Sequence, residues 1–105
     1  PEVGANSMTL RIAQASALRD AGDVGAASAQ LEVALELLGD ARNRRFFIAW
    51  AQSELAHCRW DQSRRDESRT LLRAALPIMA EDPDFFGRYR LRALELEHAL
   101  GPLAH

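Results

Sequence analysis

Apolar side chains recur along this chain at the three- and four-residue spacing of amphipathic helices. The pattern predicts helices over residues 8–21, 24–38, 41–61, 65–79 and 83–100. β-branched residues are few, and no segment alternates between apolar and polar side chains over four or more positions. We therefore expect an all-α fold. The clearest stripe lies on the second helix, at Ala27, Leu31, Ala34, Leu35 and Leu38.

Turn signals separate these helices. Gly22 can end the first helix in a left-handed conformation, and Asp23 can cap the next one. Asp82 followed by Pro83 is a typical helix start. Pro77 lacks an N–H group, so we expect it to kink the fourth helix or to end it early.

A shift of 41 residues brings the two halves of the chain into register. A pair of antiparallel helices cannot bury its own apolar face, so neighbouring pairs must stack. We expect one helix pair in residues 8–41, a second in 42–82 and a closing helix in 83–101, with a tag or linker at 1–7 and a tail at 102–105. The matching residues include Ala15 with Ala56, Asp20 with Asp61, Leu31 with Leu72, Ala34 with Ala75, Leu55 with Leu96 and His57 with His98.

The first pair resembles a tetratricopeptide repeat through Ala15, Leu18, the turn residue Gly22, and Ala27, Leu31 and Ala34. The second pair keeps Ala56, Leu72 and Ala75, but has Arg59, Ser63 and Ser68 at the other motif positions. The 41-residue period is similar to the longer variants of kinesin light chains and bacterial signalling proteins. The resemblance implies a right-handed solenoid of helical hairpins. Glu97 stands at a small-residue position, which suggests either a terminal capping helix or a cut through a longer array.

The resemblance also implies a function. Such arrays bind a peptide or a partner helix in a concave groove, without catalysis. It implies a module of a larger bacterial regulatory protein, such as a signalling kinase or a transcriptional regulator. The groove positions that it implies are Ile12, Ser16, Arg19, Trp50, Ser53, His57, Trp60, Asp61, Leu94 and His98.

The third helix carries a second stripe of its own, at Phe46, Trp50, Ser53, His57 and Trp60. Aromatic side chains on a concave surface are typical of binding hot spots. The same side chains could instead pack against the first and fifth helices, and for Phe46 and Trp50 the core and the groove both remain open. His57 and Trp60 are expected in the groove.

Charge and composition limit the classes of partner that we expect for this chain. The net charge is −2, which gives no general attraction to nucleic acid or anionic lipid. The arginine clusters are interspersed with acidic residues, so we interpret them as a solvated face with local ion pairs. No apolar run approaches the roughly 20 residues that span a bilayer. The single cysteine, Cys58, fits a reducing compartment, and we expect a cytoplasmic protein that binds neither nucleic acid nor membrane.

Two Glu-x-x-His pairs, Glu54 with His57 and Glu95 with His98, raise the question of a metal site. A di-iron bundle needs a further glutamate from each of two more helices, and none is suitably placed. Cys58 adjoins His57, but neighbours on a helix point about 100° apart and form no catalytic dyad. We therefore expect no enzyme, metal or cofactor, and a buried thiol.

Two alternatives stay open beside the groove. One is a small metal-binding helical bundle. The other is self-association as a homodimer through the C-terminal helix, whose apolar residues lack a partner helix of their own. These residues are Leu91, Leu94, Leu96 and Leu100.

Overall fold

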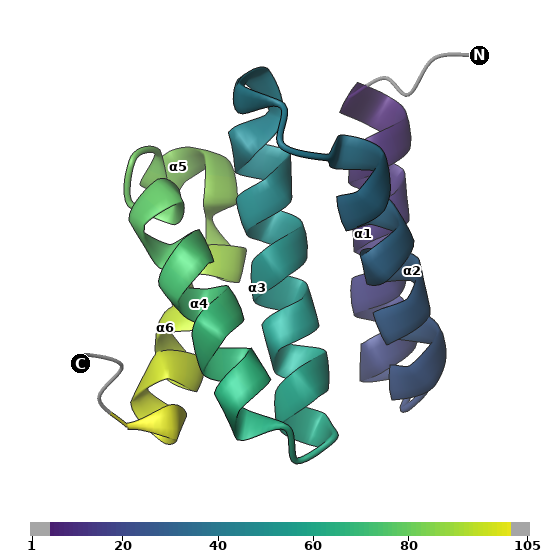
Figure 1. Cartoon of the computed structure of the whole chain (residues 1–105), viewed down its shortest axis with the longest axis vertical. Helices are drawn as coiled ribbons and strands as arrows, with labels where there is room; N and C mark the ends of the chain where they lie inside the picture. The colour runs from purple at the N-terminus through teal and green to yellow at the C-terminus, as the bar shows by residue number, and fades with distance from the viewer. Residues whose placement is uncertain (1–4, 102–105) are drawn as a thin grey trace.

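The computed structural model of the chain describes residues 5–101, with side chains described from residue 7, and it is all-α. The described residues contain no strand, and their helices pack as hairpins (Figure 1). The expected fold class is therefore confirmed. The helices are α1 (Ala5–Asp20), α2 (Val24–Leu38), the short 3₁₀ helix η1 (Arg42–Arg44), α3 (Arg45–Asp61), α4 (Arg65–Met79), α5 (Pro83–Phe86) and α6 (Arg88–Leu100).

Two helix starts differ from the sequence prediction. Helix α1 begins at Ala5, so part of the expected linker at 1–7 is helical, while residues 1–4 and 102–105 lie outside the described part. Helix α3 begins at Arg45 rather than at residue 41, because a 3₁₀ turn precedes it, which is common at helix N-termini. Helix α4, in contrast, has the predicted bounds: it ends at Met79, with Pro77 in its last turn.

The turns within the two hairpins share one geometry. Gly22, at φ 94°, ends α1, and the Asp23 side chain accepts a hydrogen bond of 3.1 Å from the Ala26 N–H. Forty-one residues on, Ser63 has φ 63° and takes the place of Gly22. The backbone bonds also correspond: the Gly22 N–H donates to Arg19 at 2.9 Å, and the Ser63 N–H donates to Trp60 at 3.0 Å. Ser63 thus holds a conformation that glycine adopts more readily.

The expected fifth helix is broken at Gly87. Its φ of 52° interrupts the helix, and its N–H donates to the Pro83 carbonyl at 2.8 Å. Asp82 caps the short α5 through the Phe85 N–H, at 3.1 Å, as the Asp-Pro signal indicated. A positive φ and the low helix propensity of glycine explain the break. Helix α6 therefore starts at Arg88 with an orientation of its own.

Helix α3 lies in the middle of the molecule, with α1 and α2 on one side and α4 and α6 on the other (Figure 1). It contacts all four of these helices, which explains why it is apolar on more than one side. The core is one continuous cluster that includes Met8, Ile12, Leu31, Ala51, Leu55, Cys58, Leu72, Met79, Phe86 and Leu96.

Candidate interaction groove

The described part of the chain has a surface formed by α1, α3 and α6, which we call the groove, and it contains two hollows. The Trp60 hollow has a volume of about 300 Å³. Three residues expected at the groove line it, together with four from α6: Arg19, His57, Trp60, Arg92, Glu95, Leu96 and Ala99. The smaller Trp50 hollow, of about 180 Å³, is lined by Thr9, Trp50, Phe85, Phe86 and Tyr89.

Several residues expected to line the groove lie in the core instead. Ile12 and Ser53 have no exposed surface, so they cannot contact a partner in this structure. The Ser53 hydroxyl donates a hydrogen bond of 2.9 Å to the Trp50 carbonyl within α3. Ser16 is also buried, at 7% exposure. Close packing of α1 against α3 explains this placement, since small side chains let two helices approach.

The open question about Phe46 and Trp50 is answered by their contacts. Trp50 is 7% exposed, and its ring centroid lies 4.8 Å from that of Tyr89 in α6. The Phe46 ring lies 5.3 Å from Phe85 and 5.5 Å from Phe86. These aromatic side chains pack α5 and α6 against α3. Phe46 and Trp50 therefore stabilise the fold as packing residues.

Charged side chains bridge the groove at its Trp60 end. Arg19 of α1 binds Asp61 of α3 through two nitrogens, at 2.6 and 3.2 Å. Burial would lower the pKa of Arg19, but the hydrogen bond and the charge of Asp61 outweigh it and raise that pKa. Arg92 of α6 lies 3.6 Å from Asp20 of α1. These two pairs connect the three helices of the groove.

His57 forms part of the floor of the Trp60 hollow and is 7% exposed. Its Nδ1 lies 2.8 Å from the Ser53 carbonyl oxygen, and its Nε2 lies 3.3 Å from the Arg92 carbonyl oxygen. Burial lowers the pKa of His57 more than the Ser53 hydrogen bond and the charge of Glu54 raise it. The ring is therefore neutral at pH 7 and donates to one carbonyl at a time. His57 thus lies between α3 and α6, and little of its ring is left for a partner.

Trp60 is the aromatic side chain that remains half-buried in this hollow. The Arg65 guanidinium lies over its ring, 4.9 Å from the centroid. A cation over an indole face is a favourable contact, worth about 0.5–1 kcal/mol at an exposed site. Trp60 is thus held in place but still presents ring surface to the hollow.

The residues of α6 that line the groove differ from those expected from the 41-residue register. Leu94 is half-buried and His98 is exposed, and neither lines the Trp60 hollow. Arg92, Glu95 and Ala99 line it instead. Because Gly87 restarts the helix at Arg88, the face that α6 turns toward α3 could not be read from the 41-residue register alone.

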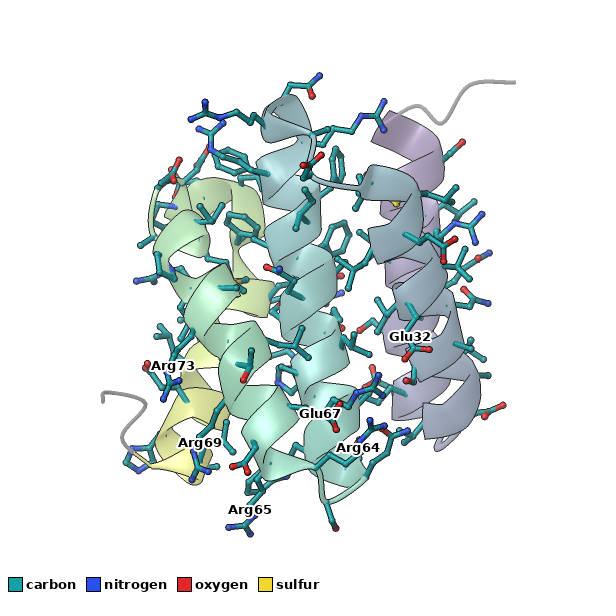
Figure 2. The ribbon with its side chains drawn as sticks, in the orientation of Figure 1. Glu32, Arg64, Arg65, Glu67, Arg69 and Arg73 are labelled. Carbon is teal, nitrogen blue, oxygen red and sulfur yellow. The ribbon has the colours of Figure 1, made fainter. Side chains whose placement is uncertain are left out.

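Two charged side chains in the core were not anticipated. Glu54 is 1% exposed, and its Oε2 has no hydrogen-bond partner. Arg59 is 6% exposed and donates to Ser28 at 2.7 Å, Gln62 at 2.9 Å and Glu32 at 2.5 Å. Figure 2 shows Glu32 on α2 and Glu67 near the start of α4, and a carboxylate oxygen of Glu67 lies 3.9 Å from Arg59. Arg59 thus links the two hairpins at the position where the first hairpin has Leu18.

Two arginines at the N-terminal end of α4, Arg64 just before the helix and Arg69 within it, form local ion pairs. Arg64 pairs with Glu67, and Arg69 lies 3.4 Å from Asp66 (Figure 2). Arg69 also donates to the Leu100 carbonyl at 2.9 Å, which ties α4 to the end of α6. This agrees with the interpretation of these clusters as solvated ion pairs.

Other candidate chemistry in the described part of the chain is limited. Cys58 is fully buried, as expected, and burial raises the pKa of its thiol to about 11. Such a thiol is unreactive at neutral pH. Among residues 5–101, no three histidine, cysteine, aspartate or glutamate side chains gather closely enough to hold a metal ion. No helix in this range is both long and apolar enough to cross a membrane.

Comparison with known proteins gives no relative. No protein family model, curated protein or solved structure matches the chain.

Proposed function

We propose that the chain is a protein–protein interaction module that binds an extended peptide or a partner helix in the groove of α1, α3 and α6. The observation that carries the proposal is the Trp60 hollow, in which Arg19, Trp60 and Glu95 come from three helices that are separate in the sequence. Tryptophan and arginine on a concave surface are the side chains that binding hot spots use most.

The charges of the hollow suggest the character of the partner. Arg19 and Arg92 are each paired with an aspartate, and Glu95 is an exposed acid on the rim. A partner that presents an apolar or aromatic side chain to Trp60 and a basic group to Glu95 would complement this surface.

The proposal includes a role without catalysis or cofactor. Cys58 and His57 of α3 are both buried, and the His57 ring lies within hydrogen-bond distance of backbone carbonyls. Neither side chain is open to a substrate, which supports binding rather than turnover.

We also propose that the chain is a helical-repeat module of a larger bacterial regulatory protein in the cytoplasm, of the kind that the tetratricopeptide resemblance implies. Support comes from the helix bounds, because α2 (Val24–Leu38) and α4 (Arg65–Met79) start and end 41 residues apart. The shared turn geometry at Gly22 and Ser63 adds to it.

The groove can be tested with peptides selected from a random displayed library on the immobilised full chain. We expect Trp60→Ala to weaken binding of the selected peptides at least tenfold, with a small fall in melting temperature. Leu37→Ala, which removes a 49% exposed apolar side chain from α2, is the matched control and should bind as the parent does. Equal binding by Trp60→Ala and the parent would contradict the proposal.

Self-association through the C-terminal helix remains the second candidate. One observation favours it: Leu91 is 60% exposed on α6. Leu96 and Leu100, however, are each 5% exposed and already belong to the core, so the apolar surface left for a dimer is smaller than the sequence indicated. Light scattering over a concentration series tests it, and a mass that stays monomeric rules it out.

A further inference from the structure

The Trp50 hollow is lined almost entirely by aromatic side chains. Its walls are Trp50 of α3, Phe85 and Phe86 of α5, Tyr89 of α6 and Thr9 of α1, and none of these residues is charged. Trp50 and Phe86 are 7% and 2% exposed, so they lie deepest. Phe85 is 47% exposed and stands at the rim. The hollow is therefore an aromatic pocket that opens beside Phe85.

The rings of this hollow meet at angles rather than stacking face to face. The Trp50 and Tyr89 ring centroids lie 4.8 Å apart with their planes at 51°, and those of Phe85 and Phe86 lie 5.0 Å apart at 85°. Stacked rings cover each other's faces, whereas rings at such angles leave part of their faces uncovered. The face of an aromatic ring carries partial negative charge and attracts a cation. Four such rings around one hollow favour a positively charged ligand.

The same aromatic cluster already binds cations of this chain. The Arg45 guanidinium lies over the Phe46 ring, 4.8 Å from the centroid, and the Arg88 guanidinium lies over Tyr89 at 5.3 Å. Phe46 in turn contacts Phe85, with the two centroids 5.3 Å apart. Neither arginine lines the hollow itself. Cation–π contacts are thus a property of this cluster, and the hollow offers further ring surface for one.

The size and the polar groups of the hollow narrow the kind of cation. Its volume is about 180 Å³. An apolar protein cavity of about 150 Å³ accommodates a benzene molecule, and a trimethylammonium group is no larger. The side-chain acceptors among the lining residues are the hydroxyl groups of Thr9 and Tyr89. A primary ammonium would lose hydration here without enough acceptors for its three N–H groups, whereas a quaternary ammonium has no N–H to satisfy.

We propose that the Trp50 hollow binds a quaternary ammonium group, such as the trimethylammonium group of choline or of a trimethylated lysine side chain. The methyl groups lie against the faces of Trp50, Phe85 and Tyr89, as in an aromatic cage. This site is separate from the Trp60 hollow and requires no ligand there, so the proposal does not depend on the peptide proposed for the groove.

The test is an NMR titration of the full 105-residue chain with choline chloride, with sodium chloride at equal ionic strength as the control for salt. We expect choline to shift the Trp50 indole N–H and the amides of Phe85 and Tyr89, while the Trp60 indole stays unchanged. 3,3-Dimethylbutan-1-ol has the shape of choline but no charge. It should bind about fivefold more weakly than choline, because it gains no cation–π attraction.

Matched variants test the roles of the ring and of the charge. Phe85→Leu keeps apolar volume but removes a ring from the rim, and it should weaken choline binding about fivefold with little effect on the neutral alcohol. Phe47 contacts Phe85 at 6.1 Å but does not line the hollow, so Phe47→Leu is the control and should bind choline as the parent does. Arg88→Gln removes an exposed cation from Tyr89 and should tighten choline binding. Urea unfolding checks that each variant is folded.

A further titration separates the two sources of the ligand. A peptide with trimethyllysine should shift the Trp50 indole, and its unmethylated form should not. Tighter binding of the methylated peptide than of choline assigns the group to a modified protein, and weaker binding assigns it to a small molecule. Both results support the proposal.

Four results would overturn the proposal. The first is a shift of the Trp50 indole with choline no larger than that with sodium chloride. The second is equal binding of choline and the neutral alcohol, which would show a merely apolar hollow. The third is weaker choline binding by Arg88→Gln, which would show that the hollow does not select a cation. The last is an equal shift of the Trp50 indole by the methylated and the unmethylated peptide.

Discussion

At the scale of single residues, the core of this protein is organised around side chains that a hydrophobicity pattern cannot place. The sequence shows Arg59 as a departure from the apolar position held by Leu18, but not what it binds. Its partners Ser28 and Glu32 lie on a helix 27 or more residues away, so the network depends on how the hairpins stack. The burial of Glu54 could not be predicted from the sequence for the same reason.

The Arg59 network gives the first prediction. Arg59→Ala removes charge-assisted hydrogen bonds to Ser28 and Gln62, together with the packing of a buried side chain. Such bonds are worth roughly 1.5–3 kcal/mol, and we expect the free energy of unfolding to fall by about that amount. Arg59→Leu should cost less, because leucine, the residue at the corresponding position 18, keeps apolar packing volume that alanine removes. Urea unfolding measures both, and an equal loss for the two variants would contradict this account.

His57 gives a prediction about pH. Burial lowers the pKa of His57 in the folded chain, so the unfolded chain takes up a proton at a higher pH than the folded chain does. Its contribution to stability is therefore complete above the ordinary pKa of about 6.5 and is lost as the pH falls below that value. The slope for one proton is at most about 1.4 kcal/mol per pH unit.

The measurement compares urea unfolding at several pH values between 7.5 and 4.5 for the parent and His57→Gln. The parent should lose more stability than His57→Gln over this range. His98→Gln, which removes an exposed imidazole, is the control. Parallel pH profiles for the parent and His57→Gln would show that burial of His57 does not govern the acid response.

At the scale of elements, the positions of the helices could be predicted from the spacing of apolar residues and from the capping residues. A break within a helix could not be predicted in this way. Asp23 and Asp82 cap their helices as the sequence indicated. The break at Gly87 was missed because a single glycine within an apolar period is compatible with a continuous helix. That break fixes which residues of α6 face the groove, so the expected roles of Leu94 and His98 rested on a helix that does not run unbroken.

The turn at Ser63 provides a prediction at this scale. Ser63 has φ 63°, which disfavours a residue with a Cβ atom. Ser63→Gly should raise the free energy of unfolding by about 0.5–1 kcal/mol, after the extra flexibility of glycine in the unfolded chain is taken into account. Ser63→Ala keeps the Cβ atom and should bring no gain. Thermal or urea unfolding of the parent, Ser63→Gly and Ser63→Ala measures these changes in stability. A stabilised Ser63→Ala with an unchanged Ser63→Gly would contradict the prediction.

At the scale of the whole molecule, the all-α fold of helical hairpins could be predicted because helix signals cover most of the chain. The groove could be predicted only in part. Arg19, His57 and Trp60 come together as expected, since the 41-residue register placed them on corresponding faces of α1 and α3. Ile12 and Ser53 are buried, because a register identifies corresponding positions but not how closely two helices pack.

The most direct test of the groove is a map of where a bound peptide changes the NMR spectrum of the full chain. With a peptide from the library selection, we expect shifts at the Trp60 indole and at the amides of Arg19, Arg92 and Glu95, while Leu10 and Val33 stay unchanged. The largest shifts at Leu10 and Val33 or along the arginines of α4, with the Trp60 indole unaffected, would contradict the groove as the binding site.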